Sequence, residues 1–330
     1  HSLHRRQRQM CIRDSTYSDQ NLDHNDIFLD LSGQYNQERN TYSLSGAYYK
    51  ISNLNSQSSD FGITGRPVKR DQWNIVPQYQ RLITERLIFS LTYNHTDVEF
   101  IDAEGTGYVP YATDILSGSL AYGLTEKDKI NFILQATDYA SKDNAFEYQL
   151  FVTRLGIEHE ISELWNVDFT IGGSRRNSSN TTTFSYDFFG QPILITQTQD
   201  FTDKGYVLDT GFKRNLETGY ITGRVSRDNV SNSFGGLNEV DAIRFVVEQN
   251  LSSLWRYRIN ASYQDIEAIS ANTRSEDRDI FRFEPIILYK IDRHWTATAS
   301  YRYIARKFKS DTSDDRAPHS NRIYVGMTYN

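Results

Sequence analysis

The chain has 330 residues, a formal net charge of -6 and a mean hydropathy of -0.62. The acidic balance argues against nucleic-acid binding, which needs a basic surface to neutralise phosphates, and no run of about 18 apolar residues is present, so no transmembrane helix is predicted. Tyrosine (22) and phenylalanine (18) are abundant, and a low mean hydropathy is compatible with a membrane barrel, whose strands face lipid only with alternate residues.

Residues 1–15 differ from the rest of the sequence. They have no strand or helix period, they lack the apolar stretch of a signal peptide, and they resemble a translated sequencing adapter. The sequence therefore predicts a non-native segment at 1–15, outside any barrel wall, and the N-terminal loop of a truncated chain at 16–25. Without the four arginines and one aspartate of 1–15, the net charge falls to -9. The single cysteine, Cys11, lies in this segment, so neither a disulfide nor a thiolate metal site is expected.

A period of two dominates residues 26–330. In one clear case, apolar side chains occupy every second position: Trp255, Tyr257, Ile259, Ala261 and Tyr263. Polar residues, among them Arg256 and Arg258, fill the positions between them. Successive side chains of a strand point to opposite faces, so each such segment has one apolar and one polar face. The pattern predicts fifteen strands, at 26–36, 41–50, 71–81, 86–99, 113–124, 128–141, 145–160, 164–178, 198–214, 217–230, 238–252, 254–268, 277–292, 294–308 and 319–330.

The connections between these strands alternate between short and long. In the short ones an apolar residue ends the strand, and a Ser, Thr or Asp follows that can bond its own backbone and turn the chain. They lie at 83–86, 124–127, 161–164, 251–254 and 291–294. The long ones are polar and lie at 51–70, 100–112, 179–197, 229–237, 269–276 and 309–318. Short turns at one end and long loops at the other are typical of outer-membrane barrels, whose turns are periplasmic and whose loops are extracellular.

The predicted fold class is therefore all-β, an antiparallel up-and-down transmembrane β-barrel at 26–330 in a bacterial outer membrane. Fifteen strands are visible, and because bacterial barrels have even strand numbers, the intact protein is predicted to have sixteen or more. A soluble propeller or sandwich is the alternative. Against it, soluble strands average about five or six residues, and the strands predicted here are longer. Aromatic residues also stand at both ends of several apolar faces, as at membrane interfaces.

Three segments resemble β-barrel porins found beside bacterial exopolysaccharide loci. They are FRFEPIILYKIDRHW at 281–295, ASYRY at 299–303 and the closing NRIYVGMTYN at 321–330. A weaker similarity is present in WNIVP at 73–77. The resemblance implies an outer-membrane porin connected with export or surface assembly of exopolysaccharide. These motifs are barrel motifs, so they specify a fold rather than a cargo.

Charged residues on the polar faces are candidates for lining the lumen. They are Arg224, Glu248, Arg256, Arg258, Arg282, Glu284, Arg302 and Arg306. Charge inside a barrel is tolerated because the lumen is wet or the charges pair. One interpretation is a network of ion pairs that stiffens the wall. The other is a basic strip that guides an anionic solute, such as a carboxylated sugar, through bidentate guanidinium contacts.

No catalytic constellation is recognised. The histidines are scattered, and the sequence has no zinc motif, phosphate loop or dinucleotide fingerprint. The chain is therefore expected not to be an enzyme and to hold neither a cofactor nor a metal.

The leading hypothesis is a porin-like barrel linked to exopolysaccharide export or surface assembly. The alternatives are a general diffusion porin for small solutes and a structural or adhesive surface barrel whose long loops are the working part. The expected partners are outer-membrane lipid, lipopolysaccharide, the barrel-assembly machinery and polysaccharide, without nucleic acid.

Overall fold

The computed structural model describes residues 4–5, 9–15, 24–52, 68–101, 103–104, 108–143, 145–188, 191–231, 237–269, 277–309 and 319–329. Every regular element in these ranges is a β-strand. Among them, no helix is long and apolar enough to cross a membrane. The predicted all-β class is therefore confirmed.

Fifteen strands, β3 to β17, match the fifteen predicted ones. Their bounds are β3 His24–Asn36, β4 Asn40–Ser52, β5 Lys69–Thr84, β6 Leu87–Ile101, β7 Tyr111–Gly123, β8 Asp128–Ser141, β9 Phe146–Ser162, β10 Trp165–Phe188, β11 Gln191–Leu216, β12 Gly219–Ser231, β13 Leu237–Asn250, β14 Trp255–Ala268, β15 Arg278–Lys290, β16 Trp295–Phe308 and β17 His319–Tyr329. Each strand pairs antiparallel with the next one along the chain. This is the predicted up-and-down order.

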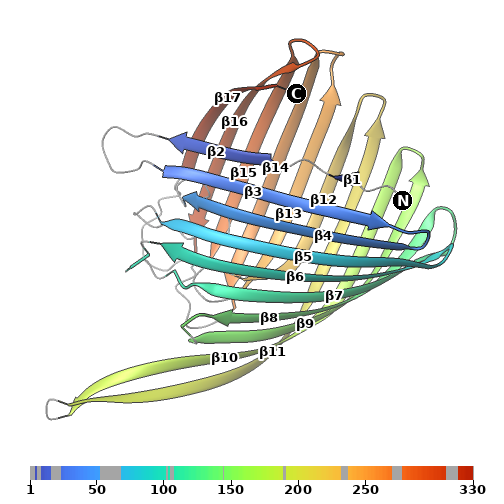
Figure 1. The fold of residues 1–330 in the computed structure, drawn as a ribbon. Helices are drawn as coiled ribbons and strands as arrows, with labels where there is room; N and C mark the ends of the chain where they lie inside the picture. Colours follow the sequence, from blue (N-terminus) through green and yellow to red (C-terminus); the bar gives the residue numbers. More distant parts are fainter. Residues whose placement is uncertain are drawn as a thin grey trace.

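The sheet curls into two facing walls. Figure 1 shows β3 to β9 as one wall and β12 to β17 as the wall behind it, with the strands of the two walls steeply inclined to each other. The β10–β11 hairpin forms the corner between them. We call the end of the sheet with the short turns the turn end, and the opposite end the loop end. Much of the chain predicted as long loops lies outside the described residues.

The short turns form as the sequence predicts. In each, a side-chain oxygen accepts a hydrogen bond from a backbone N–H two or three residues further on, which is how Ser, Thr and Asp fix a tight turn. Thr125 Oγ1 accepts from the N–H of Lys127 at 3.1 Å and from that of Asp128 at 2.9 Å. Thr84, Ser162, Ser252 and Asp292 make the corresponding bonds in the other turns.

The predicted loop at 179–197 is wrong, because most of this segment extends strands β10 and β11. Their pairing continues to Phe188 and Gln191, whereas β10 pairs with β9 only as far as Asn180. The result is a two-stranded ribbon that projects beyond the barrel at the lower left of Figure 1. The threonine run at 181–183 has no apolar alternation, and only the short alternation of Phe184, Tyr186 and Phe188 follows it. Threonine nevertheless favours strands, and the hydroxyls of Thr181 and Thr198 lie 3.2 Å apart across the ribbon.

The prediction that residues 1–15 stay outside the wall is also wrong for the described part of that segment. β1 (His4–Arg5) and β2 (Gln9–Ser15) both pair antiparallel with β3. An unpaired strand edge offers N–H and C=O groups that any extended segment can bond. This pairing uses the main chain, so a sequence without a strand pattern is able to form it.

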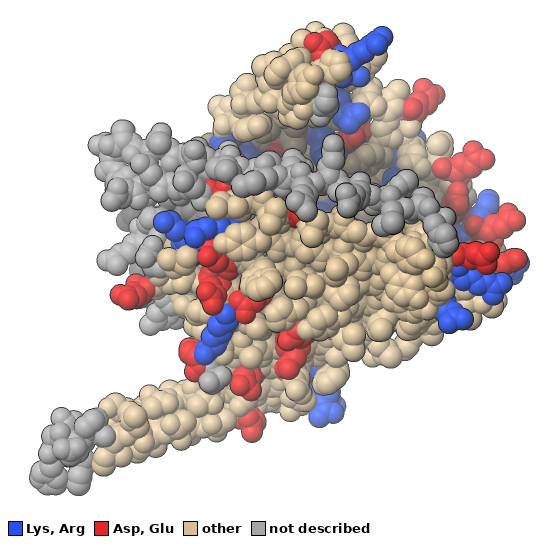
Figure 2. Space-filling model, viewed as in Figure 1, with Lys and Arg blue, Asp and Glu red and all other residues tan. Residues whose placement is uncertain are grey.

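The outer face of the sheet carries exposed apolar side chains at alternate positions. On β8, for example, Leu134 is 51% exposed, whereas Tyr139 on the other face is fully buried. Figure 2 shows the outer face of β3 to β8 as a broad uncharged area, with most charged residues gathered toward its two ends. An uncharged band between polar borders is the surface that a barrel presents to lipid.

The inner face is most deeply buried at its loop end. There a cluster of apolar side chains from both walls packs together, and we call it the loop-end cluster: Val98, Tyr111, Tyr139, Phe146, Tyr148, Leu150, Val152, Val207 and Leu237. The Tyr139 ring stacks on Tyr111 at 5.1 Å and on Tyr148 at 4.9 Å between centroids. A smaller inward group, Ile266, Ile280 and Ile304, is also buried at this end. The turn half of the inner face is mainly polar, with a few apolar residues such as Ile88 and Leu288, and it is partly exposed.

Candidate lumen site

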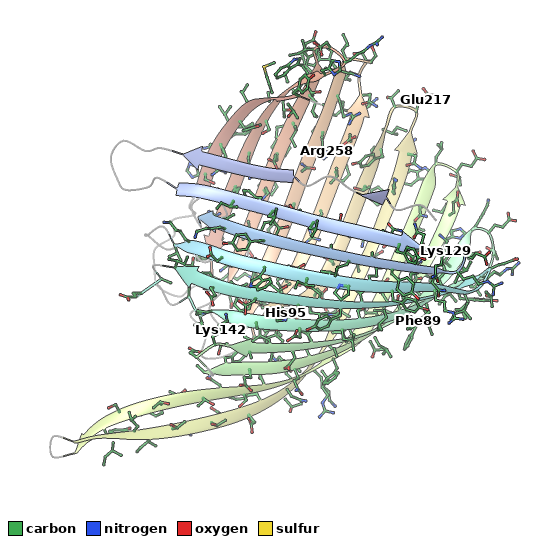
Figure 3. All side chains as sticks on the ribbon, viewed as in Figure 1. Phe89, His95, Lys129, Lys142, Glu217 and Arg258 are labelled. Carbon is green, nitrogen blue, oxygen red and sulfur yellow. The ribbon has the colours of Figure 1, made fainter. Side chains whose placement is uncertain are left out.

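The inner face of β13 to β16 forms a wall rich in arginine, which we call the basic wall. On β14 and β16 the polar positions that include Arg258 and Arg302 share one face with the buried Ile266 and Ile304. These arginines therefore lie on the inner face, as the alternation predicts. Figure 3 labels Arg258 on the wall formed by β12 to β17.

Arg258 and Glu248 form a tight ion pair on the basic wall. The two residues are direct cross-strand neighbours on β14 and β13. Arg258 donates from Nε to Glu248 Oε2 at 2.6 Å and also from Nη2. Arg256 lies further toward the turn end, where its Nε donates to Asn250 Oδ1 at 2.8 Å and its Nη1 is 3.8 Å from Glu248 Oε1. One carboxylate thus serves two guanidinium groups, and the pair leaves net positive charge.

Arg302 and Glu284 form the second pair, between β16 and β15. Arg302 donates to Glu284 Oε1 from Nε at 2.9 Å and from Nη2 at 2.6 Å. Two further predicted residues, Arg282 and Arg306, lie nearer the loop end, and Arg306 is buried. These two arginines belong to the packed end of the wall rather than to its turn half.

Arg224 lies apart from the basic wall, at the corner of the sheet. It donates to Asp209 Oδ1 at 2.5 Å and to Asp168 Oδ1 at 3.2 Å. A second corner pair joins two strands that are not neighbours, because Arg154 of β9 donates to Asp228 of β12 at 2.9 Å. A cavity of about 530 Å³ between these residues is lined by both acidic side chains and arginines. The corner is therefore stiffened by balanced pairs, which is one of the two interpretations of the lumen charges.

The opposite wall, β3 to β9, carries inward charges on some of its strands, among them Lys129, Arg154 and Glu158, but two of its strands are neutral. On β6 and β7 the inward positions carry no Lys, Arg, Asp or Glu. Hydroxyl and amide groups bond to one another there, as in the contact of Asn74 Nδ2 with Thr96 Oγ1 at 2.9 Å. A lumen with a basic wall and a stretch of neutral polar strands offers both charge and hydroxyl contacts to a solute.

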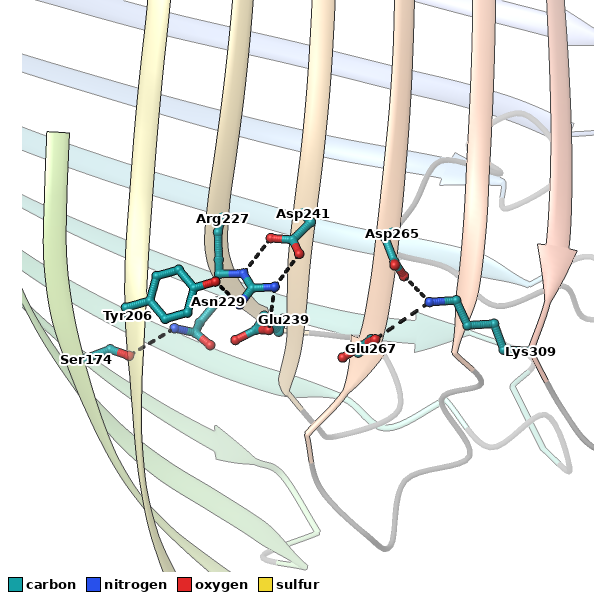
Figure 4. A network of polar contacts seen from close by, with 9 residues as sticks. All are labelled: Ser174, Tyr206, Arg227, Asn229, Glu239, Asp241, Asp265, Glu267 and Lys309. Atoms are coloured by element: carbon teal, nitrogen blue, oxygen red, sulfur yellow. Dashed lines mark hydrogen bonds and ion pairs between the residues drawn. The ribbon is translucent and has the colours of Figure 1, made fainter. Parts of the chain in front are cut away.

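Ion pairs also surround the outer face at the loop end, as Figure 4 shows. Arg227 donates from Nε to Asp241 at 2.6 Å and lies 3.4 Å from Glu239. Lys309, just beyond β16, is 2.5 Å from Asp265 and 3.7 Å from Glu267. The hydrogen bond with Asp265 raises the pKa of Lys309 to about 12. These groups border the uncharged band, where a membrane would meet water.

Sequence reasoning proposed the arginines as lumen candidates but missed two features of this region. The loop-end cluster continues the same alternation as the polar inner positions, so only the fold reveals that both walls meet there. Glu248 was found, but its sharing between Arg256 and Arg258 depends on the register of β13 and β14. Within the described ranges, no group of three or more His, Cys, Asp or Glu residues is placed to hold a metal ion.

No protein-family model and no curated protein matches the chain. Solved structures do match it. They include the copper transporter OprC, with 13% identity, a TM-score of 0.53 and coverage of 93% of this chain and 58% of its own. The ferric citrate transporter FecA has 10% identity, a TM-score of 0.55 and coverage of 92% and 55%. The alcaligin outer-membrane receptor FauA from Bordetella pertussis has 10% identity, a TM-score of 0.51 and coverage of 94% and 58%.

These likenesses concern the fold. The chain has the fold of a Gram-negative outer-membrane β-barrel, and its uncharged outer band fits that membrane. The proteins it resembles are transporters and receptors. The chain spans less than two thirds of the length of each of them.

Proposed function

We propose that the chain forms the wall of an outer-membrane transport barrel that favours anionic solutes and is held closed at its loop end. The observation that carries this proposal is the basic wall. Three inward cations near the turn end, Arg256, Arg258 and Lys290, have a single nearby acid in Glu248. A positive surface within a low-dielectric cavity concentrates anions.

The turn end is the entrance in this proposal, because the inner face is polar and partly exposed there. With the periplasmic placement of short turns, solutes would enter from the periplasm. That direction suits export of a polysaccharide, which is the cargo implied by the resemblance to porins of exopolysaccharide loci, and the basic wall favours an acidic one. A general diffusion porin for small anions would use the same wall. The largest neutral and acidic sugars that pass through the barrel distinguish this porin from a polysaccharide exporter.

A structural or adhesive role is a second candidate, and the projecting β10–β11 ribbon favours it. The ribbon carries exposed apolar side chains toward its tip, including Phe184, Tyr186 and Ile195. Exposed apolar groups on a projecting element suit contact with another surface. The remaining proposed partners are lipid at the uncharged band, lipopolysaccharide at the ion pairs on the outer face of the loop end, and the barrel-assembly machinery.

Reversal potentials in planar bilayers under a salt gradient test the transport proposal. We expect anion selectivity, which should decrease when Arg256, Arg258 and Arg302 are replaced by serine. Because the loop-end cluster restricts the lumen, the same measurement is made on Tyr148→Ala, which widens that end. Cation selectivity that is unaffected by the serine substitutions would contradict the proposal.

A further inference from the structure

The contacts on the basic wall divide its cations into engaged and available ones. Arg258 and Arg302 each bind a carboxylate, and Arg306 is buried at the loop end. Lys290, by contrast, is exposed and makes no ion pair with the described residues. Arg256 is exposed, and its acid, Glu248, is already bound more closely by Arg258. A ligand at the turn end therefore meets Arg256 and Lys290.

These two cations lie at one cleft at the turn end of β13 to β17. The cleft has a volume of about 370 Å³, and its walls include Arg256, Lys290, Thr296, Thr298 and Thr328 but no Asp or Glu. The absence of acid distinguishes it from the corner cavity, where Asp168, Asp209 and Asp228 accompany the arginines.

Strand register arranges the cleft in two rows. Lys290, Thr296 and Thr328 are direct cross-strand partners on β15, β16 and β17. Arg256, Leu288 and Thr298 form the parallel row on β14, β15 and β16. Neighbouring strands are about 4.8 Å apart, so each row spans about 10 Å. Each row offers a cation at one end and a hydroxyl at the other, with an apolar side chain, Leu288, between Arg256 and Thr298.

We propose that this cleft is a binding subsite for a carboxylated sugar unit. A carboxylate suits the two cations, because charge-assisted hydrogen bonds are the strongest of the polar contacts available. The sugar hydroxyls suit the threonine hydroxyls, which both donate and accept. The C–H face of the ring packs against Leu288. A small inorganic anion would use the cations alone and leave the rest of the cleft to water.

The inference deepens the proposed function by naming the substrate class of the basic wall. The test is calorimetric titration of the purified full chain in detergent micelles with trigalacturonate, maltotriose and inorganic phosphate. We expect trigalacturonate to bind at least about tenfold more tightly than the other two. Lys290→Gln and Arg256→Gln should each weaken its binding about tenfold, the effect of losing one charge-assisted hydrogen bond. Thr296→Val should weaken trigalacturonate binding about threefold without changing phosphate binding.

Lys129→Gln is the matched control. Lys129 has the same charge and lies at the same end of the barrel, but it belongs to the opposite wall (Figure 3), and its ammonium is 3.8 Å from Glu158. We expect it to leave trigalacturonate binding unchanged, and retained β circular dichroism confirms that each variant is folded.

Three results would overturn the subsite: equal binding of maltotriose, phosphate binding as tight as that of trigalacturonate, or loss of binding in the Lys129 control equal to that in Lys290→Gln. The titration needs no ion conduction. A barrel that binds trigalacturonate without conducting anions contradicts only the proposed function, and one that conducts anions without binding it contradicts only the subsite.

Discussion

The two halves of the inner face have the same alternating pattern and opposite environments. In the turn half, inward positions such as Asn131 and Ser119 are polar and partly exposed. In the loop half of the same strands, Tyr139 is fully buried and Tyr111 nearly so. The alternation determines which face a residue occupies, but the approach of the opposite wall determines whether that face is wet. The inner face of one barrel wall can therefore be hydrated at one end and packed like a protein core at the other.

The largest expected effect comes from truncating the centre of the loop-end cluster. Tyr139→Ala removes a ring packed against Tyr111, Phe146 and Tyr148. Loss of a buried aromatic side chain costs about 3–5 kcal/mol. Urea unfolding in lipid vesicles measures the change. Asn131→Ala, on the same strand and face but in the turn half, is the control, and we expect a change within about 0.5 kcal/mol. Equal effects would remove the difference between the halves.

The second effect compares the outer and inner faces within one strand. Ile259 lies on the outer face of β14 and Asn260 on the inner one. Ile259→Arg should cost about 2–4 kcal/mol near the midplane of the membrane, whereas Asn260→Arg places its charge in the lumen and should cost less. Refolding yields and unfolding midpoints in lipid measure both. A greater cost for Asn260→Arg would mean that the strand is displaced by one residue, which reverses every side chain.

A smaller effect, of the opposite sign, is expected for Tyr139→Phe. The Tyr139 hydroxyl is buried and makes no hydrogen bond with the described residues. A buried polar group without a partner is destabilising, so its removal should leave stability unchanged or raise it by about 1 kcal/mol. The same unfolding assay applies. A marked loss of stability would show that the hydroxyl has a partner, such as a water molecule, inside the cluster.

The smallest effect on stability is expected for the ion pairs on the outer face at the loop end. Lys309→Gln should reduce stability by less than about 1 kcal/mol, because the ion pair with Asp265 is partly exposed and screened by salt. The folded-state pKa of Lys309 is raised from 10.5 to about 12. Its contribution is therefore fully present below about pH 10.5 and lost as the pH rises through about 12. Unfolding of wild type and variant at pH 8 and pH 11.5 measures this. A wild-type advantage that grows with pH would contradict the assignment.

The sequence predicted what local signals encode. The strands follow from the period of two, and the turns follow from residues such as Thr125 and Asp292, whose side chains bond the adjacent backbone. The ribbon at 179–197 was missed because its polar run at 178–183 has no apolar alternation and the alternation of Phe184, Tyr186 and Phe188 after it is short. The pairing of Gln9–Ser15 with β3 was missed because main-chain hydrogen bonds do not depend on side-chain pattern.

The period of two indicates on which face the candidate lumen residues lie, but not which of them pair with one another. The sequence placed Arg256, Arg258 and Arg302 on one face. Which of them remains available depends on partners set by register, such as Glu248 opposite Arg258. The loop-end cluster depends on contacts between strands far apart in the chain, such as those that bring Val98 and Leu237 together. No local pattern encodes those contacts.

Thiol labelling of single inward cysteines tests the central claim most directly, which is a lumen open in its turn half and closed in its loop half. With Cys11 replaced by serine, Asn131→Cys and Ser119→Cys represent the turn half, and Val98→Cys and Val152→Cys the loop half. We predict that a membrane-impermeant maleimide labels the first two rapidly in the folded barrel and labels the second two only after unfolding. Rapid labelling of Val98→Cys and Val152→Cys in the folded barrel would contradict the account.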